Sequence, residues 1–482
     1  MQSKPKHSLQ QLLALEDDDE LLQYYCPGTT LPAWALIRVQ FIRTIMSELL
    51  FSSGALIGGG NRPAYLDLIN VLVRSRLHNI VSGRNHASEI CFFTTGLGNF
   101  ERNNISKDRL VEYFADCYPS NSLIYQDHGG WRWSNARKSN SLLYATPYNV
   151  YLQILGRLTV NNHHQELANA VISCAVENTK DRLGYIIIDQ NKKILTKSLS
   201  LQLAVFPIAA DYYANWLSQR RVKLLLKEDA CYGGRSIAIL HAAKIANVTT
   251  AEYQHGAISK GHDGYNVAPA LANSEQFRQT LPDYLLTYGN WWSQQTNMPL
   301  NKVAIGNPHL TESLKIFPKT TEKNIKTLIL GDGIDTQLYL NLACNLAKIK
   351  AIRGLPVVFR PHPLEREIVK SLNVPQGVEL DTNSDIYDSL RQSSLVISEL
   401  STGLFEAVGI VKKILLWETD KSRFAFPNLP FPSFSTIEEL EKHLEESNAS
   451  STYSEISISP GALWESNWEL NYKNFVQGVL ST

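Results

Sequence analysis

The chain has 482 residues, 44% of them hydrophobic, which is enough material for two or three globular domains. Lys and Arg total 46, as do Asp and Glu, so the formal net charge is zero and no overall field favours nucleic acid. The six cysteines are scattered without a Cys-x-x-Cys pair, which argues against a zinc site or a disulfide framework. We therefore expect the protein to lie in the reducing cytoplasm.

The N-terminal stretch lacks the long apolar run of an export signal, because its leucines lead directly into an acidic run. No window indicates a membrane span. The segment 31–51 is cationic and amphipathic, and we expect it to pack into its own domain; peripheral contact with the inner membrane is the alternative.

The first 200 residues show less regular patterning than the rest. Helices are predicted over 34–50, 65–73 and 148–155, and strands over 90–94 and 123–125. The second of these strands ends at Asp127 and His128, followed by two glycines.

A clear strand–helix–strand crossover follows. Strands are predicted over 222–227 and 248–253 around a helix over 233–244, with further strands over 283–288 and 303–305. Polar residues stand at the carboxyl ends of the first two strands, Glu228 after one and Gln254-His255-Gly256 after the other. We expect these strand ends to meet in one cleft.

After a linker rich in lysine and threonine over 314–326, a second alternation begins. Strands are predicted over 327–330, 356–359, 395–397 and 414–417, and helices over 337–351, 384–391 and 402–408. A final helix over 462–480 has apolar residues at helical spacing. The predicted fold is therefore α/β, with Rossmann-like domains over 1–312 and 325–460 and a C-terminal helix over 461–482 that packs back on the first domain.

Two strand ends of the second half suggest a phosphate site. One is Arg360-Pro361-His362-Pro363, and the other is Ser401-Thr402-Gly403, where a helix is expected to begin. Helix N-termini present unpaired N–H groups to anions, and Glu406, one turn later, could accept ribose hydroxyls. The alternative is a plain helix cap followed by a buried, satisfied glutamate.

These motifs resemble the His-Pro and Ser/Thr motifs of bacterial sialyl-, polysialyl- and Kdo transferases, and are similar to teichoic-acid glycerophosphotransferases. The resemblance implies a GT-B arrangement of two Rossmann-like domains facing a cleft. It also implies a set of donor-binding residues: Gly331, Asp332, Gly333, Arg360, His362, Pro363, Ser401, Thr402 and Glu406. Glu399 departs from the simplest pattern, since it adds a negative charge near the expected phosphate, and leaves the nucleotide open.

Glycosyl transfer needs a base for the acceptor hydroxyl, and the candidates are His255, Asp127, His128 and Glu228. No Asp-x-Asp element stands where a metal-dependent transferase would need it, so we expect transfer without a metal or another cofactor.

The sequence thus predicts a cytoplasmic glycosyltransferase that uses a nucleotide-sugar donor, with a CMP-sugar favoured. Its acceptor would be a glycan or glycolipid of a capsule, lipopolysaccharide or O-antigen. Two alternatives remain: an enzyme like UDP-N-acetylglucosamine 2-epimerase, and a non-catalytic nucleotide-sugar-binding assembly protein.

Overall fold

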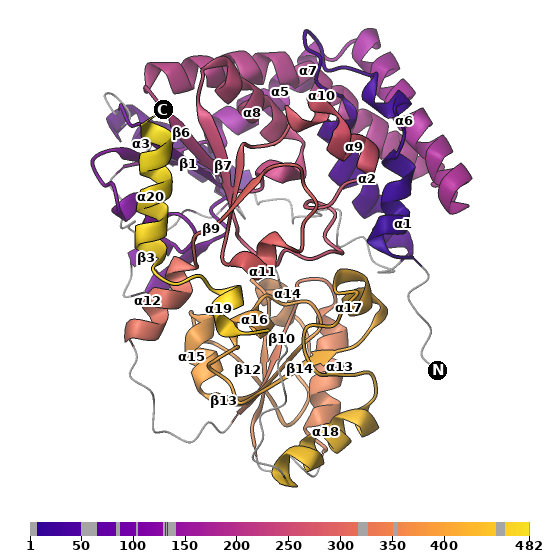
Figure 1. Ribbon diagram of the computed structural model, residues 1–482, viewed down its shortest axis with the longest axis vertical. Helices are drawn as coiled ribbons and strands as arrows, with labels where there is room; N and C mark the ends of the chain where they lie inside the picture. Colours follow the sequence, from indigo (N-terminus) through magenta and orange to yellow (C-terminus); the bar gives the residue numbers. More distant parts are fainter. Residues whose placement is uncertain are drawn as a thin grey trace.

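Two parallel sheets with flanking helices form the molecule, one above the other in Figure 1. The computed structural model describes residues 7–49, 65–82, 87–102, 105–128, 131, 133, 141–316, 326–349, 355–363, 365–449 and 458–481. Much of the predicted linker, and the glycines after His128, lie outside these residues.

The first sheet has seven strands in the order β5-β4-β1-β6-β7-β8-β9, all paired in parallel. Its strands are β1 (Ile90–Thr94), β4 (Ser122–Gln126), β5 (Leu142–Tyr144), β6 (Leu224–Lys227), β7 (Thr249–Tyr253), β8 (Tyr284–Thr287) and β9 (Asn301–Ala304). A separate antiparallel hairpin consists of β2 (Asn99–Arg102) and β3 (Ile105–Asp108). The chain therefore builds the sheet outward from β1, first to one side and then to the other, as doubly wound folds do.

Strand β1 shows why this sheet is covered on both faces. Ile90 and Phe92 pack into one apolar cluster, whereas Cys91 and Phe93 pack into another. Successive side chains of a strand point to opposite faces, so a continuous apolar run indicates burial on both sides.

The helices of this part of the chain are α1 (Leu9–Leu13), α2 (Trp34–Leu49), α3 (Tyr65–Ser82), α4 (Glu112–Asp116), α5 (Thr146–Thr159), α6 (Asn162–Leu183), α7 (Asp189–Gln219), α8 (Arg235–Ile245), α9 (Pro269–Asn273), α10 (Glu275–Arg278), α11 (Asn290–Ser293) and α12 (Pro308–Ile316). Short 3-10 helices lie at Ala14–Glu16, Glu20–Leu22 and Ala230–Tyr232. Helix α2 is buried along most of its length; even Arg38 is buried, paired with Glu16. The expectation that segment 31–51 packs into its own domain is confirmed for the described residues.

The second sheet has six strands in the order β12-β11-β10-β13-β14-β15, again all parallel. They are β10 (Lys326–Leu330), β11 (Val357–Arg360), β12 (Val378–Leu380), β13 (Ser393–Ser398), β14 (Lys413–Trp417) and β15 (Ser433–Phe434). Its helices are α13 (Thr336–Leu346), α14 (Arg366–Val369), α15 (Ile386–Arg391), α16 (Gly403–Glu406), α17 (Asp420–Ala425) and α18 (Ile437–Ala449). In chain order the strands lie 3-2-1-4-5-6, the Rossmann arrangement, so the prediction of two Rossmann-like domains is confirmed.

Several predicted elements differ from the structure. Helices α6 and α7 were not predicted, although Asn161 caps α6 and Gly184 ends it with a φ of 65°. Pro207 lies inside α7 and hides its continuity in the sequence. The predicted helix over 402–408 is only the four residues of α16, and the last predicted helix is two, α19 (Pro460–Leu463) and α20 (Trp468–Leu480).

Helix α20, yellow in Figure 1, returns to the first domain as predicted. Trp468, Tyr472 and Val476 are buried in the same apolar cluster as Ile90 and Phe92 of β1. The first core is therefore completed by the last residues of the chain.

The two domains share one apolar cluster. Trp292 of α11 is fully buried against Phe405 of α16, with ring centroids 4.7 Å apart. The Gly261 N–H donates to the Ala425 carbonyl, which joins the two backbones directly. This packing sets how the strand ends of the two sheets lie relative to each other.

By length and composition alone, α7 is long and apolar enough to cross a membrane, contrary to our expectation that no window would be. However, Leu199, Leu203 and Phe206 on this helix belong to the first apolar cluster.

Candidate functional site

Both sheets have a switch point, where the chain reverses the direction in which it adds strands. In the first sheet it lies between β1 and β6, which end at Thr94 and Lys227, and in the second between β10 and β13. Ligands of open parallel sheets bind outside the carboxyl ends of the strands at such points. The residues that follow these four strands are therefore the first candidates for a site.

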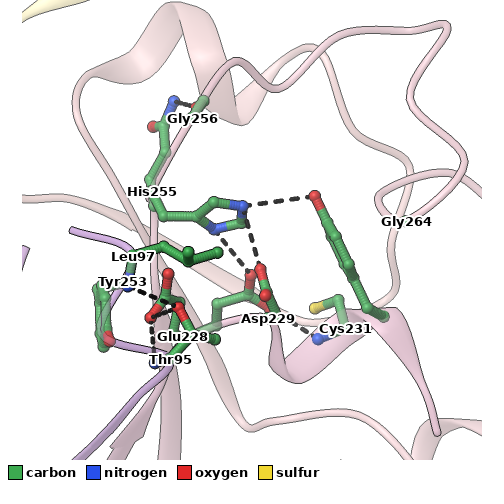
Figure 2. A network of polar contacts seen from close by, with 12 residues as sticks. Thr95, Leu97, Glu228, Asp229, Cys231, Tyr253, His255, Gly256 and Gly264 are labelled. Carbon is green, nitrogen blue, oxygen red and sulfur yellow. Dashed lines mark hydrogen bonds and ion pairs between the residues drawn. The ribbon is translucent and has the colours of Figure 1, made fainter. Parts of the chain in front are cut away.

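His255, which follows β7, lies among carboxylates in the first domain (Figure 2). Its Nε2 lies 3.1 Å from Oδ1 of Asp229, and its Nδ1 lies 3.9 Å from Oε1 of Glu252. Glu252 is held in turn, because it accepts hydrogen bonds from the Tyr265 hydroxyl at 2.6 Å and from the Cys231 N–H at 2.7 Å. The imidazole remains 20% exposed, so a substrate can reach it.

The charges around His255 determine its protonation. Burial lowers the pKa of His255, but Asp229, Glu228 and Glu252 together outweigh burial, and the pKa is raised above its ordinary value. These carboxylates stabilise the protonated ring. A proton taken up by His255 from a substrate would therefore be well accommodated.

Glu228, a predicted catalytic residue, lies beside this pair but is held from the β1 side. Its Oε2 accepts hydrogen bonds from the Thr95 N–H at 2.7 Å and from the Thr94 and Thr95 hydroxyls. Burial, together with the negative charge of the neighbouring Asp229, raises the pKa of Glu228 to about 7. Glu228 can therefore exchange a proton near neutral pH. Thr94 and Thr95 belong to no motif in the sequence, and their role is recognisable only once β1 is placed beside β6.

Asp127, another predicted base, makes its polar contacts elsewhere and not with His255 and its carboxylates. Its Oδ1 accepts hydrogen bonds from the His128 N–H and the Thr146 hydroxyl, and its Oδ2 accepts one from the Asn149 amide. These bonds tie the end of β4 to the first turn of α5. The structure thus gives Asp127 a role in local geometry, which speaks against its use as the base.

The second domain contributes two segments to the candidate site, the loop after β10 and the residues that follow β11. An added Cβ on Gly333 would lie 2.8 Å from Nδ1 of His362, so the glycine allows the imidazole to pack directly on the loop. The His362 N–H donates to Oε2 of Glu365 at 2.7 Å, which fixes the turn. Burial lowers the pKa of His362 to about 4. At neutral pH this ring is therefore uncharged and can act as a hydrogen-bonding group.

Arg360 does not lie where the sequence placed it. Its guanidinium is buried and donates to Oδ2 of Asp381 at 2.7 Å, to the Asn383 carbonyl and to the Ser389 hydroxyl. The alternation of a strand explains this direction, because neighbouring side chains of β11 point to opposite faces. Arg360, predicted to bind the donor, is therefore engaged inside its own domain.

The segment after β13 retains the predicted polar tip without the predicted helix. Ser401 Oγ accepts a hydrogen bond from the Gly403 N–H, and Thr402 precedes the single turn of α16. Four residues are too short for an aligned helix dipole, so this tip offers hydroxyls and individual N–H groups. Glu406 is buried and accepts a hydrogen bond from the Tyr387 hydroxyl at 3.2 Å.

Glu399 is the residue that departs from the motif of the families that this sequence resembles, and its negative charge is compensated within the domain. Lys421 Nζ lies 2.7 Å from its Oε2 and 3.4 Å from Oδ2 of Asp332. Burial raises the pKa of Glu399 to about 7, although Lys421 acts against this shift. Lys421 thus links the ends of β10 and β13 and removes much of the repulsion that Glu399 would exert on a phosphate.

Arg109, which follows β3, is a further candidate that was not predicted from the sequence. Burial acts against its charge, but Glu406, Tyr288, Tyr387 and Asp385 together outweigh burial and raise its pKa. Tyr288 belongs to the first domain and the other three to the second, so Arg109 lies at the junction between them. Within the described part of the chain it has no ion pair with a carboxylate. Its position depends on a hairpin and on domain packing, and no sequence motif signals it.

The strand ends of the two domains face each other. A Cβ added to Gly256, next to His255, would lie 3.9 Å from Oγ1 of Thr402. We call this region, with His255 on one side and His362, Ser401 and Thr402 on the other, the interdomain junction. The structure therefore brings together most of the predicted site residues and leaves out Asp127 and Arg360.

Asp229, Glu252 and His255 are also close enough to hold a metal ion, since their ligand atoms lie within 4.8 Å of one another. Two observations disfavour an ion there. Both oxygens of Glu252 already accept hydrogen bonds, and His255 turns a different nitrogen to each carboxylate. This arrangement suits a protonated imidazole between two anions.

A separate cavity of about 220 Å³ lies between α5, α7 and α8. It is lined mainly by apolar side chains such as Leu152, Val205 and Phe206, with no Asp, Glu or His among the lining residues. It therefore lacks groups that could transfer a proton at neutral pH.

Comparisons with known proteins add little to these observations. No protein-family model and no curated protein matches the sequence. Similar solved structures include a variant of the wall teichoic acid polymerase TagF, at 13% identity over 87% of this chain and 99% of that one, with a TM-score of 0.44. The UDP-GlcNAc 2-epimerase of Neisseria meningitidis is 12% identical over 82% and 99% of the two chains, with a TM-score of 0.41. The lipopolysaccharide outer core galactosyltransferase WaaB is 12% identical over 81% and 99%, with a TM-score of 0.38. With TM-scores this low we draw no function from them, and the fold assignment rests on the strand orders above.

Proposed function

We propose that this protein is a glycosyltransferase that moves a sugar from a nucleotide-activated donor to a hydroxyl group of an acceptor. The observation that carries the proposal is the interdomain junction. There, a histidine flanked by two carboxylates is followed by Gly256, on which an added Cβ would lie 3.9 Å from Oγ1 of Thr402 in the hydroxyl tip of the second Rossmann-like domain. A proton acceptor thus lies opposite a site suited to a nucleotide phosphate.

In this proposal His255 is the base. It removes the proton from the acceptor hydroxyl as the oxygen bonds to the sugar, while the bond between the sugar and the donor phosphate breaks and the nucleotide leaves. Asp229 and Glu252 stabilise the imidazolium that forms.

The second domain would receive the departing phosphate. The hydroxyls of Ser401 and Thr402 and the neutral ring of His362 can donate hydrogen bonds, and Arg109 supplies the positive charge that Arg360 does not. Glu406 would hold the ribose. The loop Gly331-Asp332-Gly333, ending beside His362, would allow the donor to approach closely.

The finer assignment is a CMP-sugar donor and an acceptor on a capsule, lipopolysaccharide or O-antigen, as the motifs suggest. We further propose that no metal or other cofactor takes part, because protein groups supply both the base and the positive charge. Transfer should then persist in excess EDTA.

One observation favours a second candidate, an epimerase acting on a nucleotide sugar. Epimerisation needs two groups that exchange protons, and Glu228, with a pKa of about 7, lies beside His255. Transfer needs only one base. The product distinguishes the two: a free epimerised nucleotide sugar indicates the epimerase, and an extended acceptor with released nucleotide indicates the transferase.

The test begins with a thermal-shift panel of CMP, CDP, UDP, GDP and their sugars, since a ligand that binds only the folded chain raises the melting temperature. The nucleotide sugar that binds is then used to compare wild type with His255→Asn. We expect turnover to fall roughly 100- to 10,000-fold in the variant while nucleotide binding is retained. His163→Asn, at an exposed position of α6, is the matched control and should behave as wild type. Unchanged turnover in His255→Asn would refute the assigned base, and an unchanged pathway output would favour the non-catalytic assembly protein.

A further inference from the structure

Helix α3 has an unusual distribution of side chains. Seven large apolar residues on it are between 44% and 82% exposed: Tyr65, Leu66, Ile69, Val73, Leu77, Ile80 and Val81. Its buried positions are Val71 and Ser75, and its polar residues make the contacts to the sheet. A helix on a soluble domain normally has the opposite arrangement, with its apolar side turned inward.

The contacts of α3 with the edge strand β5 are specific hydrogen bonds. The Asn79 amide donates to the Tyr144 carbonyl and accepts from the Tyr144 N–H, both at 2.8 Å, while a ring nitrogen of His78 lies 2.8 Å from the Leu142 carbonyl. These bonds fix which side of α3 faces the sheet. The apolar residues are therefore held facing outward.

The exposed face is broad. At about 100° per residue, the seven positions cover an arc of roughly 160°, opposite the side that carries Val71 and Ser75. A seam for a single partner helix is narrower, because only two positions in seven contact the partner. A face of this width fits a flat apolar boundary better than one helix.

The charges on α3 complement an anionic surface. On the same wheel, Arg76 and Arg74 lie near opposite edges of the apolar arc, and Asp67 is the single acidic residue of the helix. Basic side chains at the edges of an apolar face can place their stems along lipid and their charges among headgroups. Arg74 also lies over the ring of Trp133, at 4.6 Å, which anchors this edge to the domain.

Helix α5 extends this pattern. It packs against α3 and exposes Tyr151, Ile154 and Leu158 along one stripe, with Arg157 nearby. No acidic residue occurs in α5. Both helices therefore combine exposed apolar side chains with positive charge.

We propose that α3, with α5 beside it, is a membrane-binding surface that inserts its apolar face among the headgroups of an anionic bilayer. This surface replaces segment 31–51 as the place of membrane contact, because α2, the described helix of that segment, is largely buried. The inference is independent of the reaction at the interdomain junction, because binding to lipid requires neither donor nor acceptor.

The experiment is flotation of the full chain with vesicles of phosphatidylethanolamine and phosphatidylglycerol, and with vesicles of phosphatidylcholine alone. We expect wild type to bind the anionic vesicles, and Val73→Glu/Leu77→Glu to bind them roughly tenfold or more weakly. The matched control, Ile186→Glu/Leu470→Glu, changes two similarly exposed apolar residues elsewhere and should bind as wild type. Arg76→Gln/Arg157→Gln should weaken binding to the anionic vesicles only.

The main alternative is that α3 is an interface between two copies of the chain, and light scattering on the same variants tests it. A wild type that does not bind vesicles, or a Val73→Glu/Leu77→Glu variant that binds as well as wild type, would overturn the proposal. So would a solution dimer that this variant dissociates without vesicle binding, since α3 would then be an interface between two copies. Turnover of substrate plays no part in these outcomes, so they are separate from the test of the proposed function.

Discussion

Asp229 adopts a left-handed backbone conformation after β6, with φ 57° and ψ 33°. An aspartate takes up this conformation more readily than most residues, but at some energetic cost. In this conformation, Oδ1 of Asp229 lies 3.1 Å from Nε2 of His255. Strained residues tend to occur at functional sites, which supports a positioning role for Asp229 beside the proposed base.

We predict that Asp229→Asn lowers the pKa of His255. Removal of this charge should shift the pKa of His255 down, because a carboxylate near an imidazole favours its protonated form. NMR titration of the His255 ring measures this without any substrate, and the pH midpoint of turnover should move in the same direction. Asp181→Asn, a surface change, should leave the titration unaltered. An unchanged His255 titration in Asp229→Asn would contradict the assignment.

The two arginines, Arg109 and Arg360, should have opposite phenotypes. Arg360→Met leaves Asp381 as a buried, uncompensated charge, which should cost about 3–5 kcal/mol of the free energy of unfolding. Arg109→Met, which breaks no ion pair among the described residues, should lower that free energy less than Arg360→Met does and weaken nucleotide binding by roughly 10- to 100-fold, since it removes a charged hydrogen-bond donor. Urea unfolding and isothermal titration with the bound nucleotide measure the two quantities. The reverse result would restore Arg360 as the phosphate ligand.

At the scale of elements, α20 connects the chain terminus to the first sheet. Tyr472 is fully buried among the side chains of this core, and its ring packs 4.7 Å from that of Phe114. Its hydroxyl has no hydrogen-bond partner among the described residues. A buried hydroxyl of this kind reduces stability, whereas the ring contributes to it.

We therefore predict opposite effects for two substitutions at Tyr472. Tyr472→Phe keeps the ring, removes the unsatisfied hydroxyl, and should raise the free energy of unfolding by about 1 kcal/mol. Tyr472→Ala should lower it by about 3–5 kcal/mol, because a large cavity remains. Leu470→Ala, on the exposed side of α20, is the control and should change it by less than about 0.5 kcal/mol. Destabilisation by Tyr472→Phe would show that the hydroxyl has a partner after all.

At the scale of the whole molecule, buried ionisable groups in both domains make stability depend on pH. Burial lowers the pKa of His262 in the first domain and of His362 in the second to about 4. Each contributes stability that is lost as the pH falls below the ordinary histidine value of about 6.5, because the unfolded chain then binds protons that the folded chain does not. Glu228 and Glu399, with pKa values of about 7, act in the opposite direction, since their folded forms bind protons more readily.

The contribution of His262 can be isolated with His262→Gln. Between about pH 7 and pH 5 the wild type should lose about 2 kcal/mol more stability than this variant, from a folded pKa of about 4 and an unfolded one near 6.5. The Gly264 N–H donates to Nδ1 of His262, which favours the neutral ring and supports this direction. Urea unfolding at the two pH values gives the comparison. Equal losses would mean that His262 titrates normally.

The sequence determined the number and type of domains, because apolar runs that end in polar residues are local patterns. Strand β1 at 90–94, the crossover from β6 to β7, and β10, β11, β13 and β14 of the second sheet could be predicted in this way, whereas the short edge strands β12 and β15 were not. It also identified His255, His362 and Ser401-Thr402, which follow strands directly. Helices α6 and α7 were missed, since polar residues dilute the pattern of one and Pro207 interrupts the other.

Only the tertiary structure decided which of these residues act together. Three of these placements have no local signal in the chain: Asp127 bonds side chains of α5, Arg360 turns into its own domain, and Arg109 lies between the domains. A side chain's direction and its partners depend on strands that pair across long separations, as β1 does with β6. The ends of local elements can therefore be predicted from the chain, whereas the charges that meet at the interdomain junction depend on how two sheets and their shared core pack.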